Sequence, residues 1–306
     1  MEYDVIGDIH GKGGMLEALL RKLGYTERSQ GWTPPQGRQA VFLGDLIDRG
    51  EEQLKVLDIV RRMTDRGDAR CIMGNHELNA IGWVTPDPRN PGAYLRPHTA
   101  TKRKQHEAFL SQVGEGSERH REIVNWLRTL PPALDLQGIR VAHAWWHPDH
   151  AEFARERLGG RPLEDAFLHE VFEKGSPAWQ AYEGLTKGYE LALPAGAHFL
   201  DKDGHERREV RTQWWRGDAK TYREIAVIEE AQRARIPELD LPTSYTPTPV
   251  EGAPVFVGHY WLDGPLQPRT PKVACLDFSV GNGGPLVAYQ WRGEDLVTAD
   301  HFVAVR

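Results

Sequence analysis

Five separated segments of the sequence each place a residue of a metal-binding type directly after a short apolar stretch. The residues delivered in this way are Asp8 with His10, then Asp45, Asn75, His143 and His259. Alternate residues of an extended chain point to the same side, so Asp8 and His10 can bind one ion together. Carboxylate, amide and imidazole groups bind divalent metals, and ligands of open α/β sheets lie beyond the carboxyl ends of the strands. The repeated pattern therefore predicts a metal centre built from strand ends.

The number of candidate ligands indicates two ions rather than one. Six groups are too many for a single four-coordinate ion that must also keep a position open for water. We expect Asp45 to bridge two ions and Asp8 and His10 to complete the first. The remaining groups, Asn75, His143 and His259, would complete the second. Two ions about 3.5–4 Å apart are a recurring device for hydrolysing phosphate esters. The sequence therefore predicts a phosphoesterase that uses a metal-activated water.

Three residues beside these ligands predict how the phosphate is handled. His76 follows the ligand Asn75 and can protonate the leaving-group oxygen as a general acid. Asp48 follows the bridging Asp45 by three positions and can accept from the His76 imidazole and keep it charged. Arg49 offers two parallel donors to phosphate oxygens. We expect the remaining histidines, including His106 and His120, to be structural or solvated, because none follows a strand.

Three of these segments resemble the signature motifs of calcineurin-like metallophosphoesterases, and more narrowly those of the phosphoprotein phosphatase branch. The motifs are Gly7-Asp8-Ile9-His10-Gly11, Gly44-Asp45-Leu46-Ile47-Asp48-Arg49-Gly50 and Gly74-Asn75-His76-Glu77. The resemblance implies an α/β fold, a mixed β-sandwich flanked by helices, and attack by a metal-bridging hydroxide without a phosphoenzyme. It implies manganese as the expected metal, with iron, zinc or nickel as alternatives. The layout resembles small bacterial members, which include protein phosphatases and dinucleoside tetraphosphatases.

Two motifs depart from the family pattern. Many members end their last motif in Gly-His-x-His, whereas here His259 is followed by Tyr260 and Trp261, as in the protein phosphatase branch. The usual His-Gly-Gly of the fourth motif is replaced by His143-Ala144-Trp145-Trp146-His147. His147 and His150 are therefore alternative ligands, but the position directly after a strand favours His143.

A second arginine of the family binds phosphate from the region between these two motifs. The segment Trp214-Trp215-Arg216-Gly217 resembles that region, so the resemblance assigns Arg216 to the substrate. The alternative is a surface charge beside a patch of core aromatics.

The order of the expected elements predicts a parallel β-α-β-α-β unit at the start of the chain. Leucines between residues 16 and 23, and apolar residues between 54 and 63, recur at helical spacing between the strands. Two further helices are expected near residues 106–113 and 123–130. The apolar stretches 273–280, 286–291 and 302–305 suggest an antiparallel meander at the end of the chain.

We expect residues 1–148 and 251–306 to form the phosphoesterase core. Residues 149–250 differ in pattern and are interpreted as an α+β insertion that caps the site. A hairpin turn is expected at Asp201-Lys202-Asp203-Gly204, and a Pro/Thr-rich stretch, 241–249, returns the chain to the core.

Composition is that of a folded enzyme and argues against two classes of partner. The net charge of −6 disfavours nucleic-acid polymers, although a local group of arginines still allows a nucleotide. No apolar run approaches the roughly 20 residues that span a bilayer, and the chain enters a strand at once, so we expect neither a membrane partner nor a signal peptide. Cys71 and Cys275 lie within apolar strands, which favours a cytoplasmic protein.

Three functions remain open from the sequence alone. The first is a bacterial protein phosphatase that acts on phosphoserine, phosphothreonine or phosphotyrosine. The second is a dinucleoside polyphosphate hydrolase such as a diadenosine tetraphosphatase. The third, of another class, is a non-catalytic phosphate-binding protein, which the intact set of catalytic residue types disfavours.

Overall fold

The computed structural model describes every residue except 201–203, 205, 229 and 246–248. The chain divides into two compact units, Met1–Lys187 together with Ala253–Arg306, and Gly188–Gly252. Within the described residues no helix has the length and apolar character needed to cross a membrane. The predicted role of 149–250 as a cap over the site stays a prediction.

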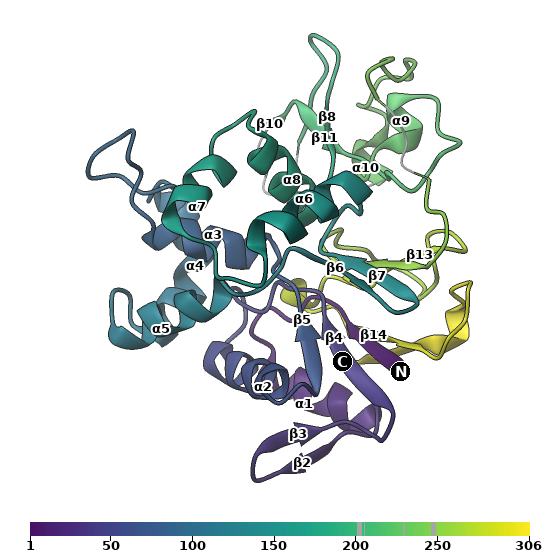
Figure 1. Ribbon diagram of the computed structural model, residues 1–306. Helices are drawn as coiled ribbons and strands as arrows, with labels where there is room; N and C mark the ends of the chain where they lie inside the picture. The colour runs from purple at the N-terminus through teal and green to yellow at the C-terminus, as the bar shows by residue number, and fades with distance from the viewer. Residues whose placement is uncertain (201–203, 205, 229, 246–248) are drawn as a thin grey trace. The chain divides into compact units, whose positions relative to one another are not determined.

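The first unit contains a five-stranded sheet with the order β15-β14-β1-β4-β5 (Figure 1). Its strands are β1 (Glu2–Ile6), β4 (Arg38–Phe42), β5 (Ala69–Cys71), β14 (Leu286–Trp291) and β15 (Phe302–Val305). Strands β1, β4 and β5 run parallel, and β14 and β15 are added antiparallel at the other side of β1. The predicted parallel β-α-β-α-β unit is confirmed, because α1 (Gly13–Lys22) and α2 (Gln53–Asp65) connect these strands.

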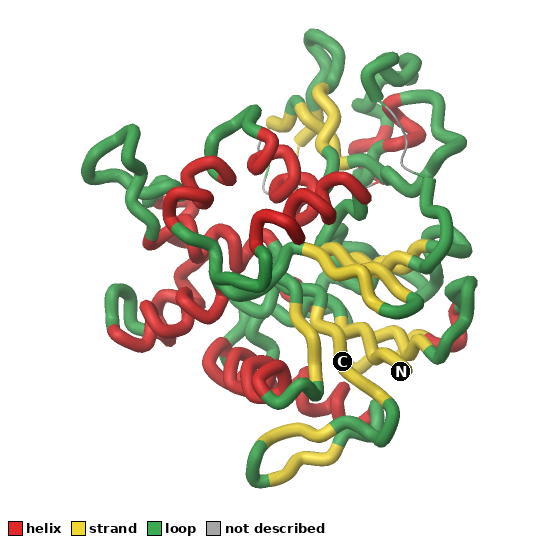
Figure 2. The backbone as a smooth tube through the Cα atoms, viewed as in Figure 1, coloured by secondary structure: helices red, strands yellow, loops and turns green. Residues whose placement is uncertain are grey.

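A second sheet of four strands has the order β13-β12-β7-β6. Its strands are β6 (Ala133–Leu136), β7 (Ile139–Ala142), β12 (Val255–Val257) and β13 (Val273–Cys275). Strand β12 pairs in parallel with both β7 and β13, and β6 pairs antiparallel with β7. The two sheets appear as two layers in Figure 2.

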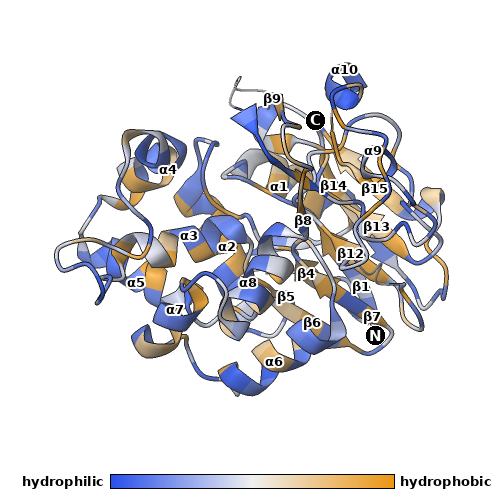
Figure 3. Cartoon of the chain, turned by 90° about the horizontal axis from the view of Figure 1, so that it is seen from above, coloured by the Kyte–Doolittle hydropathy of each residue, from blue (hydrophilic) through white to orange (hydrophobic). Residues whose placement is uncertain are grey.

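One hydrophobic core joins the two sheets. Val5, Val41 and Ile72 from the first sheet and its strand ends share a buried cluster with Val141 and Phe256 from the second. Burying one such side chain contributes about 1.5–3 kcal/mol. Strands β12 and β13, buried throughout, are hydrophobic along their length in Figure 3. The predicted mixed β-sandwich is confirmed.

Helices flank these sheets. Helix α2 carries polar and apolar residues side by side (Figure 3) and buries Val56, Leu57, Val60 and Met63 on one face. After β5 come α3 (Asn75–Val84), α4 (Ala100–Val113) and α5 (Glu118–Leu127). Thr99 and Ser117 cap α4 and α5 by accepting from backbone N–H groups of the first turn. The two helices expected near 106–113 and 123–130 are therefore present.

A group of three helices follows β7 in the same unit. They are α6 (Pro148–Leu158), α7 (Asp165–Val171) and α8 (Pro177–Lys187), and they pack on one another. Pro148 begins α6 at a position that needs no N–H donor. Gly82 of α3 lies so close to the Phe172 ring that a Cβ there would come within 2.4 Å of it.

The second unit has a small core of its own. Strands β8 (Glu190–Ala192) and β11 (Glu209–Arg211) pair antiparallel, as do β9 (Phe199–Leu200) and β10 (Glu206–Arg207). Short helices α9 (Tyr222–Ile225) and α10 (Glu230–Arg233) complete it. The antiparallel pairing of β9 and β10 agrees with the predicted hairpin, but its turn residues 201–203 lie outside the described residues, as do 246–248 of the predicted Pro/Thr-rich return.

Two elements differ from expectation. The prediction of a C-terminal antiparallel meander is wrong for its first strand. Strand β13 joins the second sheet, while β14 and β15 lie in the first. Between them lie the 3-10 turns η1 (Val280–Asn282) and, after β14, η2 (Ala299–His301). A short hairpin of β2 (Thr26–Arg28) and β3 (Gly31–Thr33) was not expected, and it fills part of a stretch that reads as a Pro/Gly-rich loop.

The Asp4 carboxylate, fully buried in β1, gives a test of this fold. It forms an ion pair with Arg38 and accepts from the Tyr25 hydroxyl at 2.9 Å. Asp4→Ala leaves a largely buried guanidinium unpaired, so we expect the free energy of unfolding to fall by about 3–5 kcal/mol. Urea denaturation measures it. Arg61→Ala, which breaks an exposed pair with Glu122, is the control and should change it by less than about 1 kcal/mol. Equal effects of both substitutions would contradict this account.

Candidate metal centre

The Asp45 carboxylate lies at the meeting point of four segments. Its Oδ2 is 3.3 Å from Nε2 of His143 and 3.8 Å from Nε2 of both His10 and His76. Among the residues that the structure describes, two groups of three can hold an ion: His10 with Asp45 and His76, and Asp45 with His143 and His259. Asp45 belongs to both, which is the arrangement expected of a residue shared by two ions.

The imidazoles of His10 and His143 are fixed through their second nitrogen. Nδ1 of His10 donates to the Ile47 carbonyl at 2.9 Å, and Nδ1 of His143 donates to the Leu43 carbonyl at 2.7 Å. A proton on Nδ1 leaves the lone pair on Nε2, the tautomer that metal-ligating histidines use. Both Nε2 atoms are buried and make no hydrogen bond with any residue the structure describes. The lone pairs of these two Nε2 atoms can therefore bind a divalent cation.

Asp8 and Asn75 lie beside His259, the third member of the second group. The backbone N–H of His259 donates to Asp8 Oδ2 at 3.2 Å, and Nδ1 of His259 is 2.9 Å from Asn75 Oδ1. Burial and repulsion by the buried Asp277 carboxylate raise the pKa of Asp8 well above its usual value. A concentration of buried carboxylates is a second feature that fits bound cations.

The backbone of the site adopts unusual conformations. The residues with left-handed φ include His10 at 48°, Asp45 at 47°, Asp48 at 70°, Arg49 at 68° and His259 at 70°. Such angles cost of order 1–3 kcal/mol for a residue other than glycine and cluster at functional sites. Backbone bonds from His10 and Ile9 N–H to the Asp45 carbonyl, at 2.8 and 3.1 Å, help to fix them.

Two glycines permit the close approach of the carboxylates. A Cβ at Gly74 would lie 2.1 Å from Asp45 Oδ1, and a Cβ at Gly258 would lie 2.0 Å from Asp8 Oδ1. Neither position tolerates a side chain while the carboxylate stays in place. The glycine before Asn75 and the glycine before His259 are therefore packing requirements of the centre.

Glu77 stabilises the backbone around Asp45, a role that the motif alone does not reveal. Its buried carboxylate accepts from the N–H groups of Asp45, Leu46 and Gly74, each at 2.8 Å. Three such bonds fix the turn that presents Asp45. The clue available in the sequence is a glutamate three residues after a helix-starting glycine, the pattern of a capping box.

His76 is the most accessible imidazole of the group, with 13% of its side chain exposed. Its Nδ1 is 2.5 Å from Asp48 Oδ2, which leaves Nε2 as the atom that can carry a transferable proton. Burial lowers the pKa of His76, but the Asp45 and Asp48 carboxylates raise it above its usual value. Asp48 also contacts Nδ1 of His106 at 2.7 Å, a partner that sequence reasoning treated as structural.

The exposed Arg49 guanidinium stacks on Trp261. Its Cζ is 4.0 Å from the centroid of the tryptophan ring, a cation–π distance. On another side, a Cβ at Gly281 would lie 2.4 Å from Arg49 Cδ. Trp261 in turn donates its backbone N–H to the buried Asp277 at 2.7 Å. These contacts hold the side chain, and sequence reasoning did not predict them.

Known proteins share these motifs. The sequence profile described as calcineurin-like phosphoesterase matches residues 1–198, which is more than half of the chain. The chain belongs to the calcineurin-like phosphoesterase family. Membership implies divalent metal ions and a phosphoester substrate, as the sequence predicts.

Curated relatives of this calcineurin-like phosphoesterase match a part of the chain. A bis(5'-nucleosyl)-tetraphosphatase PrpE from Geobacillus thermodenitrificans is 47% identical over 76 residues, 25% of this chain and 31% of that protein. Its counterpart from Oceanobacillus iheyensis is 42% identical over 146 residues, 47% of this chain and 56% of that protein. The matched stretches thus span a third to about half of these relatives.

A solved structure resembles the whole chain. A mutant of a cold-active protein tyrosine phosphatase superposes with a TM-score of 0.51 at 15% identity, covering 100% of this chain and 80% of that one. At this identity the likeness concerns the fold, and it agrees with the sandwich described above.

The remaining predicted residues are His147, His150 and Arg216. His147 and His150 pack on each other with ring centroids 4.5 Å apart and belong to neither group around Asp45, whereas His143 does. Arg216 lies in the second unit, where it donates to the Glu224 carbonyl at 3.1 Å and pairs with Asp218. Its contact with phosphate stays a prediction.

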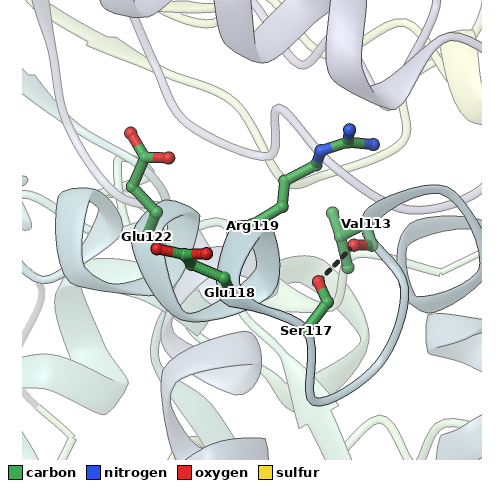
Figure 4. A pocket seen from close by; sticks show the side chains of 5 residues that line it. All are labelled: Val113, Ser117, Glu118, Arg119 and Glu122. Atoms are coloured by element: carbon green, nitrogen blue, oxygen red, sulfur yellow. Dashed lines mark hydrogen bonds between the residues drawn. The ribbon is translucent and has the colours of Figure 1, made fainter.

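A surface hollow of about 550 Å³ near the start of α5 contains none of these residues (Figure 4). It is lined by Val113, Ser117, Glu118, Arg119 and Glu122. Glu118 and Glu122 carry negative charge, so the hollow is not suited to a phosphate ester.

Gly74→Ala tests the packing around Asp45. The added Cβ displaces the carboxylate, so we expect the variant to bind no more than half as much Mn²⁺ per chain as the unmodified protein. Plasma mass spectrometry after reloading with Mn²⁺ measures the bound metal. The control is Gly217→Ala, where a Cβ meets nothing within 4 Å, and it should retain full metal content. Full metal binding by the Gly74 variant would show that Asp45 does not need this space.

Glu77→Gln tests the support of the Asp45 turn. The amide oxygen can still accept from some of these backbone N–H groups, but the NH₂ group faces at least one backbone donor, and a buried unsatisfied group costs about 1–3 kcal/mol. We therefore expect the midpoint temperature of thermal unfolding to fall and the affinity for Mn²⁺ to weaken. Glu122→Gln on the surface is the matched control. A variant with unchanged stability and affinity would contradict the assigned role.

Proposed function

We propose that the protein hydrolyses phosphomonoesters in a single displacement by water at a dinuclear metal centre. Asp45 is shared by both ions, and the other ligands are Asp8, His10, Asn75, His143 and His259. The observation that carries the proposal is the position of Asp45 Oδ2, within 3.3–3.8 Å of imidazole nitrogens from three other segments.

The residues of the chain divide the work of the reaction. Two divalent ions, when bound, lower the pKa of a water and neutralise charge on the phosphoryl group. Arg49, held against Trp261, presents two parallel donors to phosphate oxygens. His76 protonates the leaving oxygen through Nε2, while Asp48 holds its Nδ1. We propose Mn²⁺ as the metal, with iron, zinc or nickel as alternatives.

Two substrate classes are supported by different observations. The absence of a second histidine after His259 favours a protein phosphatase acting on phosphoserine, phosphothreonine or phosphotyrosine. The names of the PrpE relatives favour a dinucleoside tetraphosphate. Those matches span at most 146 residues. We propose that residues 149–250 close over the site and decide between the two, with Arg216 on the phosphate.

A substrate panel separates these candidates. The protein, stripped of metal and reloaded with Mn²⁺, is given p-nitrophenyl phosphate, its bis-ester, a phosphopeptide and diadenosine tetraphosphate. A protein phosphatase turns over the phosphopeptide with kcat/KM at least tenfold above that for the nucleotide. The opposite order establishes the nucleotide hydrolase. Bound metal without turnover of any of the four would replace both with a phosphate-binding protein.

His76→Ala tests whether His76 acts as the proton donor and not as a metal ligand. Removing a general acid lowers kcat by roughly 10²–10⁴-fold, and we expect two ions per chain to remain, because the six ligands are intact. Asp45→Asn is the contrasting variant and should reduce occupancy of both positions together. An empty position after His76→Ala would make His76 a ligand, and unchanged metal content after Asp45→Asn would argue against a shared carboxylate.

The proposed setting is the cytoplasm, in keeping with two buried, unpaired cysteines. Partners are the phosphorylated substrates themselves, and the net charge of −6 disfavours a nucleic-acid polymer.

A further inference from the structure

His106 is a buried histidine of α4 that lies outside the sequence motifs. Only 2% of it is exposed, and its Nδ1 is 2.7 Å from Oδ1 of Asp48. The other oxygen of the same carboxylate, Oδ2, is 2.5 Å from Nδ1 of His76. One carboxylate thus connects two imidazoles, a buried one on one side and the accessible one on the other.

Neighbouring aromatic side chains orient the His106 ring toward Asp48. The ring of His106 packs against Phe109 at 4.9 Å and Trp83 at 5.7 Å between centroids, which fixes its plane. An ordinary core position here would favour an apolar side chain, since a buried polar group costs free energy unless it is hydrogen-bonded. The aromatic packing instead orients one ring nitrogen at Asp48.

Asp48 needs such a partner to stay in place. Its backbone φ is 70°, and its N–H donates to the buried Gln53 Oε1 at 2.8 Å, so the main chain is fixed. The carboxylate, however, can still turn about its side-chain bonds. Two hydrogen bonds, one to each oxygen, define both its position and its plane, whereas a bond from His76 alone would leave the plane free.

We propose that His106 is a positioning residue for protonation of the leaving group, acting through Asp48 on His76. This inference rests on the proposed phosphomonoester hydrolysis. Water adds to phosphorus and releases one proton to solvent, and the bond to the leaving oxygen breaks with its electron pair on that oxygen. The oxygen takes the proton from His76 Nε2, and His76 regains a proton from solvent. His106 keeps its proton throughout and supplies alignment only.

Leaving-group dependence gives the test. 4-Nitrophenolate departs without protonation, whereas phenolate needs the proton. In the Mn²⁺-loaded enzyme, His106→Phe should lower kcat for phenyl phosphate by about 10–100-fold, the usual effect of losing a supporting contact, and for 4-nitrophenyl phosphate by less than about threefold. KM for both should be unchanged. His106→Asn, whose amide can donate from near the Nδ1 position, should restore most of the rate.

His120→Phe is the matched control. His120 is also buried, packs edge-on against Phe109 at 5.6 Å, and accepts from the Gly116 N–H at 3.1 Å. Its loss should leave the ratio of the two rates unchanged. An equal loss on both substrates for His106→Phe, or no rescue by asparagine, would overturn the inference and leave the proposed hydrolysis standing.

A measurement without turnover separates the inference from the proposed function. In the Zn²⁺-loaded, ¹⁵N-histidine-labelled protein, the Nδ1 proton of His76, bonded to a carboxylate, should resonate far downfield in the NMR spectrum. His106→Phe should shift or broaden it, and His120→Phe should not. If the wild type hydrolyses neither phosphate, the proposed function fails, and this signal still decides whether His106 positions Asp48 and His76. An unchanged signal in His106→Phe would refute that role.

Discussion

A buried carboxylate that must stay ionised governs the first unit of this protein. Burial opposes the charge of Asp45, but the neighbouring His143 and His76 imidazoles hold its pKa well below the usual value. Both the backbone and the side chain of Asp45 are fixed. Glu77 accepts from the Asp45 N–H at 2.8 Å, and the missing Cβ of Gly74 leaves room for the carboxylate oxygens. Removing water from a charge is costly unless partners replace it. The His143 and His76 imidazoles are those partners, together with the His76 backbone N–H, which donates to Asp45 Oδ1 at 3.0 Å.

The sandwich explains how distant segments reach this carboxylate. Parallel strands β1, β4 and β5 end at the same edge of one sheet, and β7 and β12 end at the neighbouring edge of the other. The shared core keeps the two edges in register, since Val41 and Val141 belong to the same buried cluster. His259 therefore meets Asp8 across 251 positions of sequence. A single loop could not bring together residues as far apart in the sequence as Asp8, Asp45 and His259.

Much of the site follows from local patterns. Strand-end position favours His143 over His147 and His150, and of these three only His143 lies in a group around Asp45. The first two helices and the parallel unit also follow from hydrophobic period. These inferences concern neighbours in sequence, where spacing and direction are linked by backbone geometry.

What sequence reasoning missed depends on partners far apart in the chain. His106 carries no strand-end signal, and its contact with Asp48 arises only because α4 packs beside the loop after β4. The stacking of Arg49 on Trp261 depends on a left-handed φ of 52° at the tryptophan, which the residue type does not announce. β13 was assigned to the wrong sheet because an apolar run shows burial but not which neighbour pairs with it.

The loop after β4 is the point where these networks meet. Alternate groups along it serve different partners: the Leu43 carbonyl fixes His143, the Ile47 carbonyl fixes His10, and Asp48 joins His76 to His106. Asp45 lies between the two carbonyls. A shift of this loop would therefore move the His10, His143 and His76 imidazoles together. Its strained angles at Asp45, Asp48 and Arg49 turn successive side chains in different directions. The positions of the imidazoles around Asp45 and of the His76–Asp48 pair are consequently set by one short segment, and neither can be altered there without the other.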